Sequence, residues 1–156
     1  MGFFDGYNVA TSGMSAQRTR INVTSANIAN AKTTHTAEGG PYKKQVVLFE
    51  DVLLANNKKK TNASDIEQAN PNSSSDLSLR AVGVKKIIKS DAPPVLRYDP
   101  THPDANEKGY VAYPDINPVI EMVDLIEAMR SYEANVTSFN THKGIDNKTL
   151  DILSGN

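Results

Sequence analysis

The C-terminal part of the chain carries an apolar repeat that a single long helix presents on one side. From Pro118 onward, apolar positions alternate spacings of three and four residues, which is the pattern of helices that pack lengthwise on other helices. Asn117 suits the N-cap position and Pro118 the first helical position. We therefore predict a helix over residues 118–153, about 54 Å long. The ten positions of the repeat, all apolar except the seventh and eighth, are Met122, Leu125, Met129, Tyr132, Val136, Phe139, Lys143, Asp146, Leu150 and Leu153.

A second helix is predicted over residues 5–30, with two apolar rows that each repeat every seven residues. The rows are offset by two residues, which places them about 160° apart around the helix. A helix that is apolar on two opposite sides is buried on both. The first row is Tyr7, Met14, Ile21 and Ile28, and the second is Val9, Ala16 and Val23.

The middle of the chain reads as short strands rather than helices. Strands are predicted at residues 43–50, at 77–89 with a bulge at Gly83, and in the short segments 93–98 and 109–113. Residues 55–76 are rich in Asn, Ser and Lys and predict an exposed, mobile loop.

The fold class is thus mainly α with a small β-rich middle lobe (α+β), in which the N- and C-terminal helices pair as a coiled coil. The predicted parts are an N-terminal helix at 1–34, the lobe at 35–116 with its loop, and a C-terminal helix at 117–156. We expect the two terminal helices to form one coiled-coil domain.

Composition excludes several functions. The chain of 156 residues has no Cys, which excludes disulfides, thiolate zinc sites and cysteine catalysis. Its net charge of −1 argues against bulk electrostatic capture by nucleic acid or an anionic membrane. No apolar stretch approaches the length of a membrane span, and the N-terminus does not resemble a cleaved signal peptide. Phosphate loops, nucleophile elbows and zinc-binding helices are missing from the sequence, so we predict no catalytic residue, cofactor or metal.

The helices themselves imply partners. Burial of the eight apolar side chains in the C-terminal repeat is worth about 12–24 kcal/mol. Ordering that helix costs more before its hydrogen bonds are counted. The N-terminal helix covers one side of it and then leaves its own opposite row uncovered. Burial against other chains resolves this, and a closed monomeric helical hairpin with a small β lobe is the alternative.

Both termini resemble the signatures of the flagellar axial family of rod, hook and hook-associated proteins. At the N-terminus these are residues 12–18 (SGMSAQR), Asn22, 27–31 (NIANA) and Thr33. At the C-terminus they are 117–119 (NPV), 121–124 (EMVD) and 130–135 (RSYEAN). Residues 36–42 (TAEGGPY) and 102–106 (HPDAN) before 109–111 (GYV) narrow the resemblance to the proximal rod.

The resemblance implies a building block without enzymatic activity. Such proteins are exported unfolded through the flagellar type III apparatus with an uncleaved N-terminus. They stack helically with other rod proteins in the periplasmic part of the basal body, between its membrane-embedded base and the hook. Their terminal helices pair as an inner layer that lines the export channel. No nucleic acid, small-molecule substrate or direct membrane insertion is implied.

Roles follow for individual residues. Met14, Ile21 and Ile28 are expected to pack on the C-terminal helix, and the Val9 row to face a neighbouring subunit. Asn27 and Asn30 end the first helix, and either cap it or bond across a subunit boundary. Arg130 and Glu133 are candidates for ion pairs between subunits, or form a screened surface pair. The candidate packing residues are Val9, Met14, Ala16, Ile21, Val23, Asn27, Ile28, Asn30, Met122, Leu125, Met129, Arg130, Tyr132, Glu133, Asn135, Val136 and Phe139.

Two other functions stay open from the sequence. A secreted or cytoplasmic coiled-coil adaptor would form a stable monomer or a discrete oligomer. An enzyme would use the acid-rich loop 99–107, which contains His102, and would show metal-dependent activity.

Overall fold

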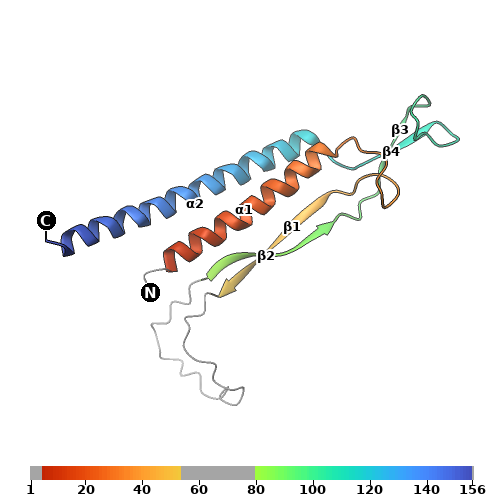
Figure 1. The fold of residues 1–156 in the computed structure, drawn as a ribbon. Helices are drawn as coiled ribbons and strands as arrows, with labels where there is room; N and C mark the ends of the chain where they lie inside the picture. The colour runs from red at the N-terminus through yellow and green to blue at the C-terminus, as the bar shows by residue number, and fades with distance from the viewer. Residues whose placement is uncertain (1–4, 54–79, 156) are drawn as a thin grey trace, which may run out of the picture.

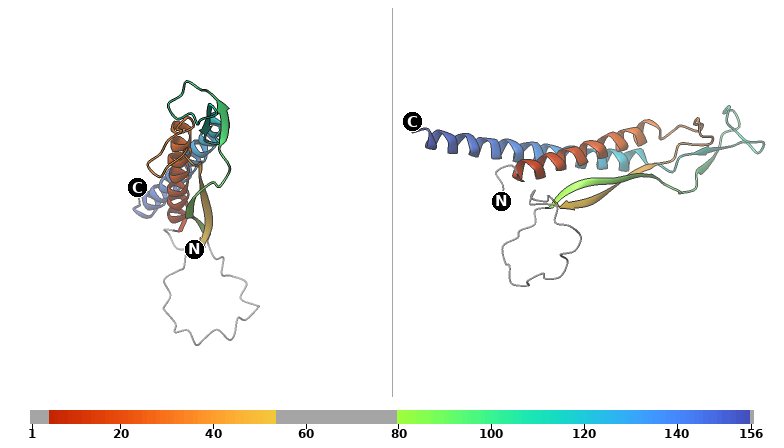
Figure 2. Two further views of the ribbon diagram at one scale, coloured as in Figure 1. Left: turned by 90° about the vertical axis from the view of Figure 1, so that its right-hand side faces the viewer. Right: turned by 60° about the horizontal axis from the view of Figure 1, so that its bottom comes forward.

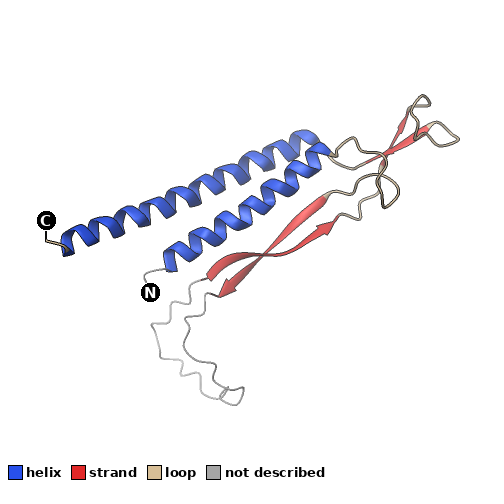
Figure 3. Ribbon diagram, in the orientation of Figure 1, coloured by secondary structure: helices blue, strands red, loops and turns tan. Residues whose placement is uncertain are grey.

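A computed structural model describes residues 5–53 and 80–155 (Figure 1). The predicted loop 55–76 lies outside these residues. Along the chain, helices come first and last and the strands lie between them (Figure 3), which confirms the mainly α class with a β-rich middle part. In chain order the elements are α1 (Asp5–Ala29), β1 (Gln45–Leu53), β2 (Arg80–Lys89), β3 (Val95–Tyr98), β4 (Tyr110–Tyr113) and α2 (Pro118–Leu153).

The helices and the first hairpin lie in three layers. α1 runs beside α2 on one side and contacts both β1 and β2 on the other, so it is the middle layer (Figures 1 and 2). α2 is the longer helix and extends beyond α1 (Figure 1). Burial on two sides is what the two apolar rows of the first helix predicted.

The start of α2 follows from its sequence. The Asn117 side chain accepts the Val119 N–H at 3.0 Å, and Pro118 occupies the first turn, where a missing N–H costs nothing. The helix continues through Lys143, Gly144 and Asp146 to Leu153, so the polar positions in the repeat do not end it.

β1 and β2 pair as an antiparallel hairpin, from Gln45 opposite Lys89 to Leu53 opposite Arg80. The register shifts between Leu48 and Phe49, which face Lys86 and Val84, so Lys85 is the extra residue. The predicted bulge at Gly83 is therefore wrong in position, because Gly83 pairs regularly with Glu50.

β3 and β4 form a second antiparallel hairpin at the far end of the molecule (Figure 1). Within the described ranges, these two strands contact each other and no further helix or strand. Aromatic contacts hold them. Tyr98 meets Tyr110 edge-on with ring centroids 5.4 Å apart, and the Arg97 guanidinium lies 5.1 Å from the Tyr113 centroid.

The buried core is made of small side chains. Its apolar members among the described residues are Ala10, Ala16, Val23, Ala81, Val111 and Ala128. The large apolar side chains of α2 and of both hairpins are instead mostly exposed. The chain by itself therefore buries little apolar area, and much of its apolar surface is available to partners.

Candidate functional site

The contacts between α1 and α2 repeat every seven residues in antiparallel order. Gly6 lies against the His142 ring, and Gly13 lies against the Asn135 side chain. Two further repeats of seven residues bring Asn27 to Glu121, and the two side chains share a hydrogen bond of 3.0 Å. Each step along α1 is matched by an equal step back along α2, so the two helices share one register over their common length.

At two positions of the repeat, the residue of α2 that faces α1 is not the predicted one. Met122 and Met129 are 49% and 47% exposed, whereas their neighbours Glu121 and Ala128 are 2% and 0% exposed. The expectation that Met129 lies under α1 is therefore wrong. Close packing between the two helices favours a small side chain at this position, and the fully buried Ala128 supplies it.

The remaining predicted residues of α2 fall into two groups. Leu125, Tyr132, Asn135, Val136 and Phe139 are half-buried, on or beside the face that meets α1. Arg130 and Glu133 are exposed and lie on the opposite side of the helix. Their participation in subunit packing stays a prediction.

The hairpin, not a neighbouring subunit, covers the second apolar row of α1. Ala16 and Val23 are 2% and 7% exposed within the chain, and Val9 lines a groove together with Phe49 of β1 and Ala81 of β2. The expectation that this row is left for another copy is therefore wrong, because β1 and β2 lie along it. In the first row, Met14, Ile21 and Ile28 are all half-buried.

A buried polar cluster joins α1, α2 and the start of β1. The Asn27 amide donates to the Gln45 carbonyl at 2.9 Å and to Glu121 Oε2 at 3.0 Å. Its oxygen accepts the Gln45 N–H at 2.9 Å and the Tyr42 hydroxyl at 3.2 Å. All four hydrogen-bonding positions of this amide are thus used, which is what a side chain 1% exposed requires.

Glu121 is the charged member of this cluster. Its Oε1 lies 2.6 Å from the Lys44 ammonium, and Oε2 accepts from Asn27. The carboxylate also sits near the N-terminus of α2, where the helix dipole favours negative charge. Burial, and then the charge of Glu121, raises the pKa of the neighbouring Tyr42 hydroxyl.

Of the two asparagines expected at the end of α1, only Asn30 acts locally. Its amide donates to the Ala26 carbonyl at 2.9 Å, and its oxygen accepts from the Thr33 hydroxyl at 3.2 Å, as a helix cap does. Asn27 instead bonds to β1 and α2 of its own chain.

Sequence reasoning missed Glu121, Lys44 and Tyr42 as members of this cluster. One signal was available: Glu121 follows three apolar or cyclic residues in the first turn of α2, where a charge needs a reason to be buried. Matching the heptads of the two helices in antiparallel order places it opposite Asn27.

At the other end of the pair, Tyr7 packs on Phe139 with ring centroids 5.0 Å apart. Its hydroxyl donates to Asp146 at 2.5 Å. This hydrogen bond, then burial and the carboxylate charge, raise the pKa of Tyr7 above 10.0. Midway along the helices, Arg20 lies 3.5 Å from Asp124 and 3.9 Å from Glu127, so charged groups flank the small-residue contact.

The side of α2 opposite α1 carries a row of exposed apolar residues in its first half. We call this row the outer face of α2. Its members are between 47% and 68% exposed, and at 100° per residue they fall on one side of the helix. Arg130 and Glu133 extend the same side, and beyond them it becomes polar at Thr137 and Asn140. The outer face consists of Val119, Met122, Val123, Ile126 and Met129.

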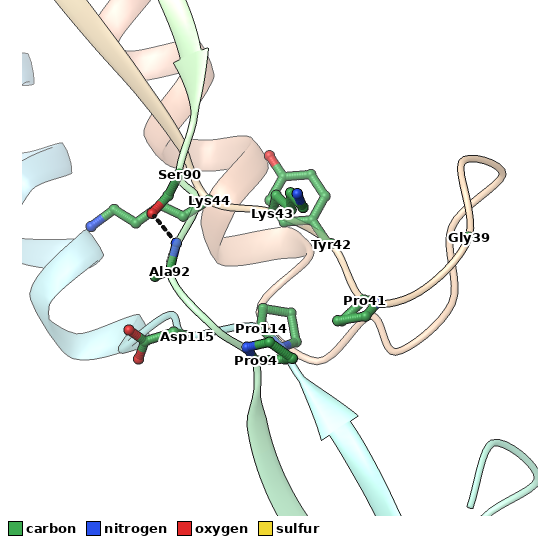
Figure 4. A pocket seen from close by; sticks show the side chains of 10 residues that line it. All are labelled: Gly39, Pro41, Tyr42, Lys43, Lys44, Ser90, Ala92, Pro94, Pro114 and Asp115. Atoms are coloured by element: carbon green, nitrogen blue, oxygen red, sulfur yellow. Dashed lines mark hydrogen bonds between the residues drawn. The ribbon is translucent and has the colours of Figure 1, made fainter. Parts of the chain in front are cut away.

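A small pocket of about 120 Å³ lies where the two hairpins join (Figure 4). Tyr42, Lys44, Pro94 and Pro114 are among its lining residues, and the Ser90 hydroxyl accepts the Ala92 N–H beside them. The Lys44 ammonium is committed to Glu121. The pocket therefore belongs to the structural joint rather than to a catalytic centre.

Hydrogen bonds tie the acid-rich loop 99–107 to itself and to Thr34, which follows the end of α1. Asp99 accepts from the Thr101 hydroxyl at 2.8 Å, His102 Nδ1 from the Asp104 N–H at 3.1 Å, and Asp104 from the Thr34 hydroxyl at 2.6 Å. Across residues 5–53 and 80–155, no three or more His, Asp or Glu side chains gather as a metal site would need. Neither α1 nor α2 is apolar enough over its length to cross a membrane.

Two family models match the helical ends of the chain. The model described as "Flagella basal body rod protein" matches residues 8–34. The model described as "Flagellar basal body rod FlgEFG protein C-terminal" matches residues 107–152.

Curated relatives match nearly the whole chain. The flagellar basal-body rod protein FlgC of Borreliella burgdorferi is 42% identical over 159 residues, covering 99% of this chain and 100% of the relative. FlgC of Bacillus subtilis is 40% identical, covering 96% and 97% of the two chains. FlgC of Salmonella typhimurium is 33% identical, covering 97% and 98%.

Proposed function

The chain belongs to the family of flagellar basal-body rod proteins, in which it is a structural subunit and not an enzyme, and we propose that it assembles through the outer face of α2. Its partners are further copies of itself and the other rod proteins of the basal body. Pairing of the two terminal helices as one coiled-coil domain, and export by the flagellar type III apparatus, are parts of this proposal.

The observation that carries the proposal is the exposure of the outer face itself. Five apolar side chains about half exposed on one side of a helix would bury area worth about 1 kcal/mol each in a subunit contact. The opposite side of α2 is already occupied by α1. A subunit contact on the outer face therefore leaves the fold of the chain unchanged.

Arg130 and Glu133 lie at the end of the outer face and add direction to such a contact. Two exposed opposite charges next to an apolar row suit the polar edge of a protein interface, where charges select the partner more than they strengthen binding.

The test is Ile126→Asp, which places a charge in the middle of the outer face. Its control is Thr137→Asp, which places the same charge on the same side of α2 but in its polar half. We expect both variants to unfold within about 0.5 kcal/mol of the parent chain, because neither position is buried.

In cells that lack their own copy of the gene, Ile126→Asp is expected to abolish rod assembly and swimming, and Thr137→Asp to retain both. Secretion of a later flagellar protein and electron microscopy of basal bodies measure the outcome. Normal rods with Ile126→Asp would disprove the role of the outer face.

A further inference from the structure

The contact between α1 and α2 has few features that distinguish one heptad from the next. Gly6, Gly13 and Asn27 present small or polar groups to α2, and Asn135 and Ala128 do the same toward α1. Small side chains interlock weakly, so packing over most of this contact penalises a slip of one heptad little, and the close fit of Gly13 to Asn135 is the exception. A slip of seven residues would move α2 by about 10.5 Å along α1.

We propose that the buried hydrogen bond between Asn27 and Glu121 fixes the register of the α1 and α2 pair. Glu121 is 2% exposed, and its only alternatives to this arrangement are burial without Asn27 or exposure by unpacking. After a slip of one heptad, Asn27 would face Ala128, which accepts no side-chain hydrogen bond. A single buried asparagine sets register in paired helices by the same principle.

Asn27 and the start of the first hairpin, to which it is bonded, move as one body with α1. Asn27 bonds both the N–H and the carbonyl of Gln45, which Lys44 directly precedes and which lies three residues after Tyr42. The hairpin therefore follows α1 and brings Lys44 along with it. β3 and β4 contact no other described helix or strand, and the hydrogen bond from Thr34 to Asp104, which ties their loop to the end of α1, is exposed, so the link through them to α2 opposes a slip little.

The other cross-helix contacts are more exposed and hold register less firmly. Arg20 reaches Asp124 and Glu127 from a side chain one-third exposed, and such pairs form readily with other acids of α2. The hydrogen bond from Tyr7 to Asp146 is specific but uncharged on the tyrosine side and only half-buried.

The sequence contains no cysteine, so a disulfide between two engineered cysteines reports directly which residues of α1 and α2 face each other. Gly13→Cys with Asn135→Cys reports the register of the structure, because a Cβ on Gly13 would lie 2.9 Å from Asn135 Cγ, the atom whose place a cysteine sulfur at position 135 takes. Gly13→Cys with His142→Cys reports a slip of one heptad, and this variant also carries Asn135→Ala, which removes the side chain that a Cβ on residue 13 would otherwise meet. Both pairs are placed in the full-length chain and oxidised under identical conditions.

In the parent sequence we expect only the first pair to form a disulfide. Adding Glu121→Leu is expected to bring the slipped disulfide up to a yield comparable with the first. Glu121→Gln keeps a hydrogen-bonding partner for Asn27 and should restore the parent pattern. Tyr7→Phe, which removes the more exposed contact, should leave the parent pattern unchanged.

A second variant moves the carboxylate that bonds Asn27 along α2 instead of removing it. Glu121→Ala with Ala128→Glu keeps the composition of α2 and shifts the carboxylate by one heptad. Asn27 then finds its partner at position 128, and the slipped disulfide should become the major product.

Several results would overturn the proposal. Unchanged pairing in both Glu121→Leu and the exchanged variant would show that packing sets the register. Loss of both disulfides together with helix content in those variants would assign Glu121 to stability alone. Failure of the parent chain to form the first disulfide would reject the helix pair on which the proposal rests.

Discussion

Gly13 and Asn135 face each other so closely that a Cβ on Gly13 would lie 2.8 Å from Asn135 Oδ1. The Asn135 side chain is itself tied to the Ser131 carbonyl by a hydrogen bond of 2.9 Å. The close approach of the two helices at this level therefore depends on the absence of a side chain at position 13.

Gly13→Ala should destabilise the chain by about 1–3 kcal/mol, because the overpacked contact outweighs the helical preference for alanine. Gly144→Ala is the matched control, since no atom lies within 4 Å of a Cβ there and the change should stabilise by up to about 1 kcal/mol. Urea unfolding followed by circular dichroism compares the two. Equal effects of the same sign would contradict the tight contact.

Tyr7 makes the helix pair sensitive to alkaline pH. Its pKa is raised by the hydrogen bond to Asp146, so the stabilisation is complete below pH 10.0 and is lost as pH rises through the raised value. Tyr7→Phe should remove this part of the alkaline transition, and Tyr98→Phe in the separate second hairpin should keep it. Helix content across the alkaline range is the measurement, and identical curves for the parent and Tyr7→Phe would refute the link.

Glu38 anchors the loop after α1 to β2. The Lys89 ammonium lies 2.6 Å from its carboxylate and lowers the pKa of Glu38 below 4.5. The contribution to stability is present above pH 4.5 and disappears as pH falls through the lowered value. In a carboxyl titration by NMR, Lys89→Met should return the pKa of Glu38 toward its ordinary range, whereas Lys85→Met should not.

The second hairpin depends on glycine at position 109. Gly109 has φ of +78°, and a Cβ there would lie 2.9 Å from the Tyr98 ring. Gly109→Ala should cost about 1–2 kcal/mol from the backbone alone, and more from the displaced ring. Gly39→Ala has a similar φ of +87° with open space around it, so it measures the backbone cost by itself. If both variants unfold alike, the ring contact contributes nothing.

Much of the fold could be predicted because it rests on local signals. The N-cap at Asn117 and Pro118 define the start of α2, and the β-branched runs locate the strand ends to within three residues. The two apolar rows of α1 correctly indicated contacts on two sides of the helix, with α2 and with the first hairpin. These signals depend on the chain within one or two turns, so no tertiary information was needed.

The errors arose where contacts between segments distant in the sequence determine which face of a helix is buried. A heptad count centred on large apolar residues placed Met122 and Met129 against α1, yet Glu121 and Ala128 lie there. The pattern assumes that the most apolar side of a helix faces its partner in the same chain. In a subunit the most apolar side can be reserved for other chains, and that possibility is invisible to periodicity.

The same limit applies to the row of Val9, Ala16 and Val23. Its apolar character predicted a covering partner, but not that the partner is the hairpin that follows in the sequence. A hairpin of nine and ten residues is long enough to lie along much of α1, and this length was the usable signal.

A helix contact lined by Gly6, Gly13 and Ala128 gains little from the hydrophobic effect, because small side chains remove little apolar area from water. Neighbours that bind only the paired helices then shift the folding equilibrium by mass action. Pairing of α1 and α2 should rise steeply with the local concentration of subunits. The chain would thus complete its folding where the rod is growing, and remain less ordered where it is dilute.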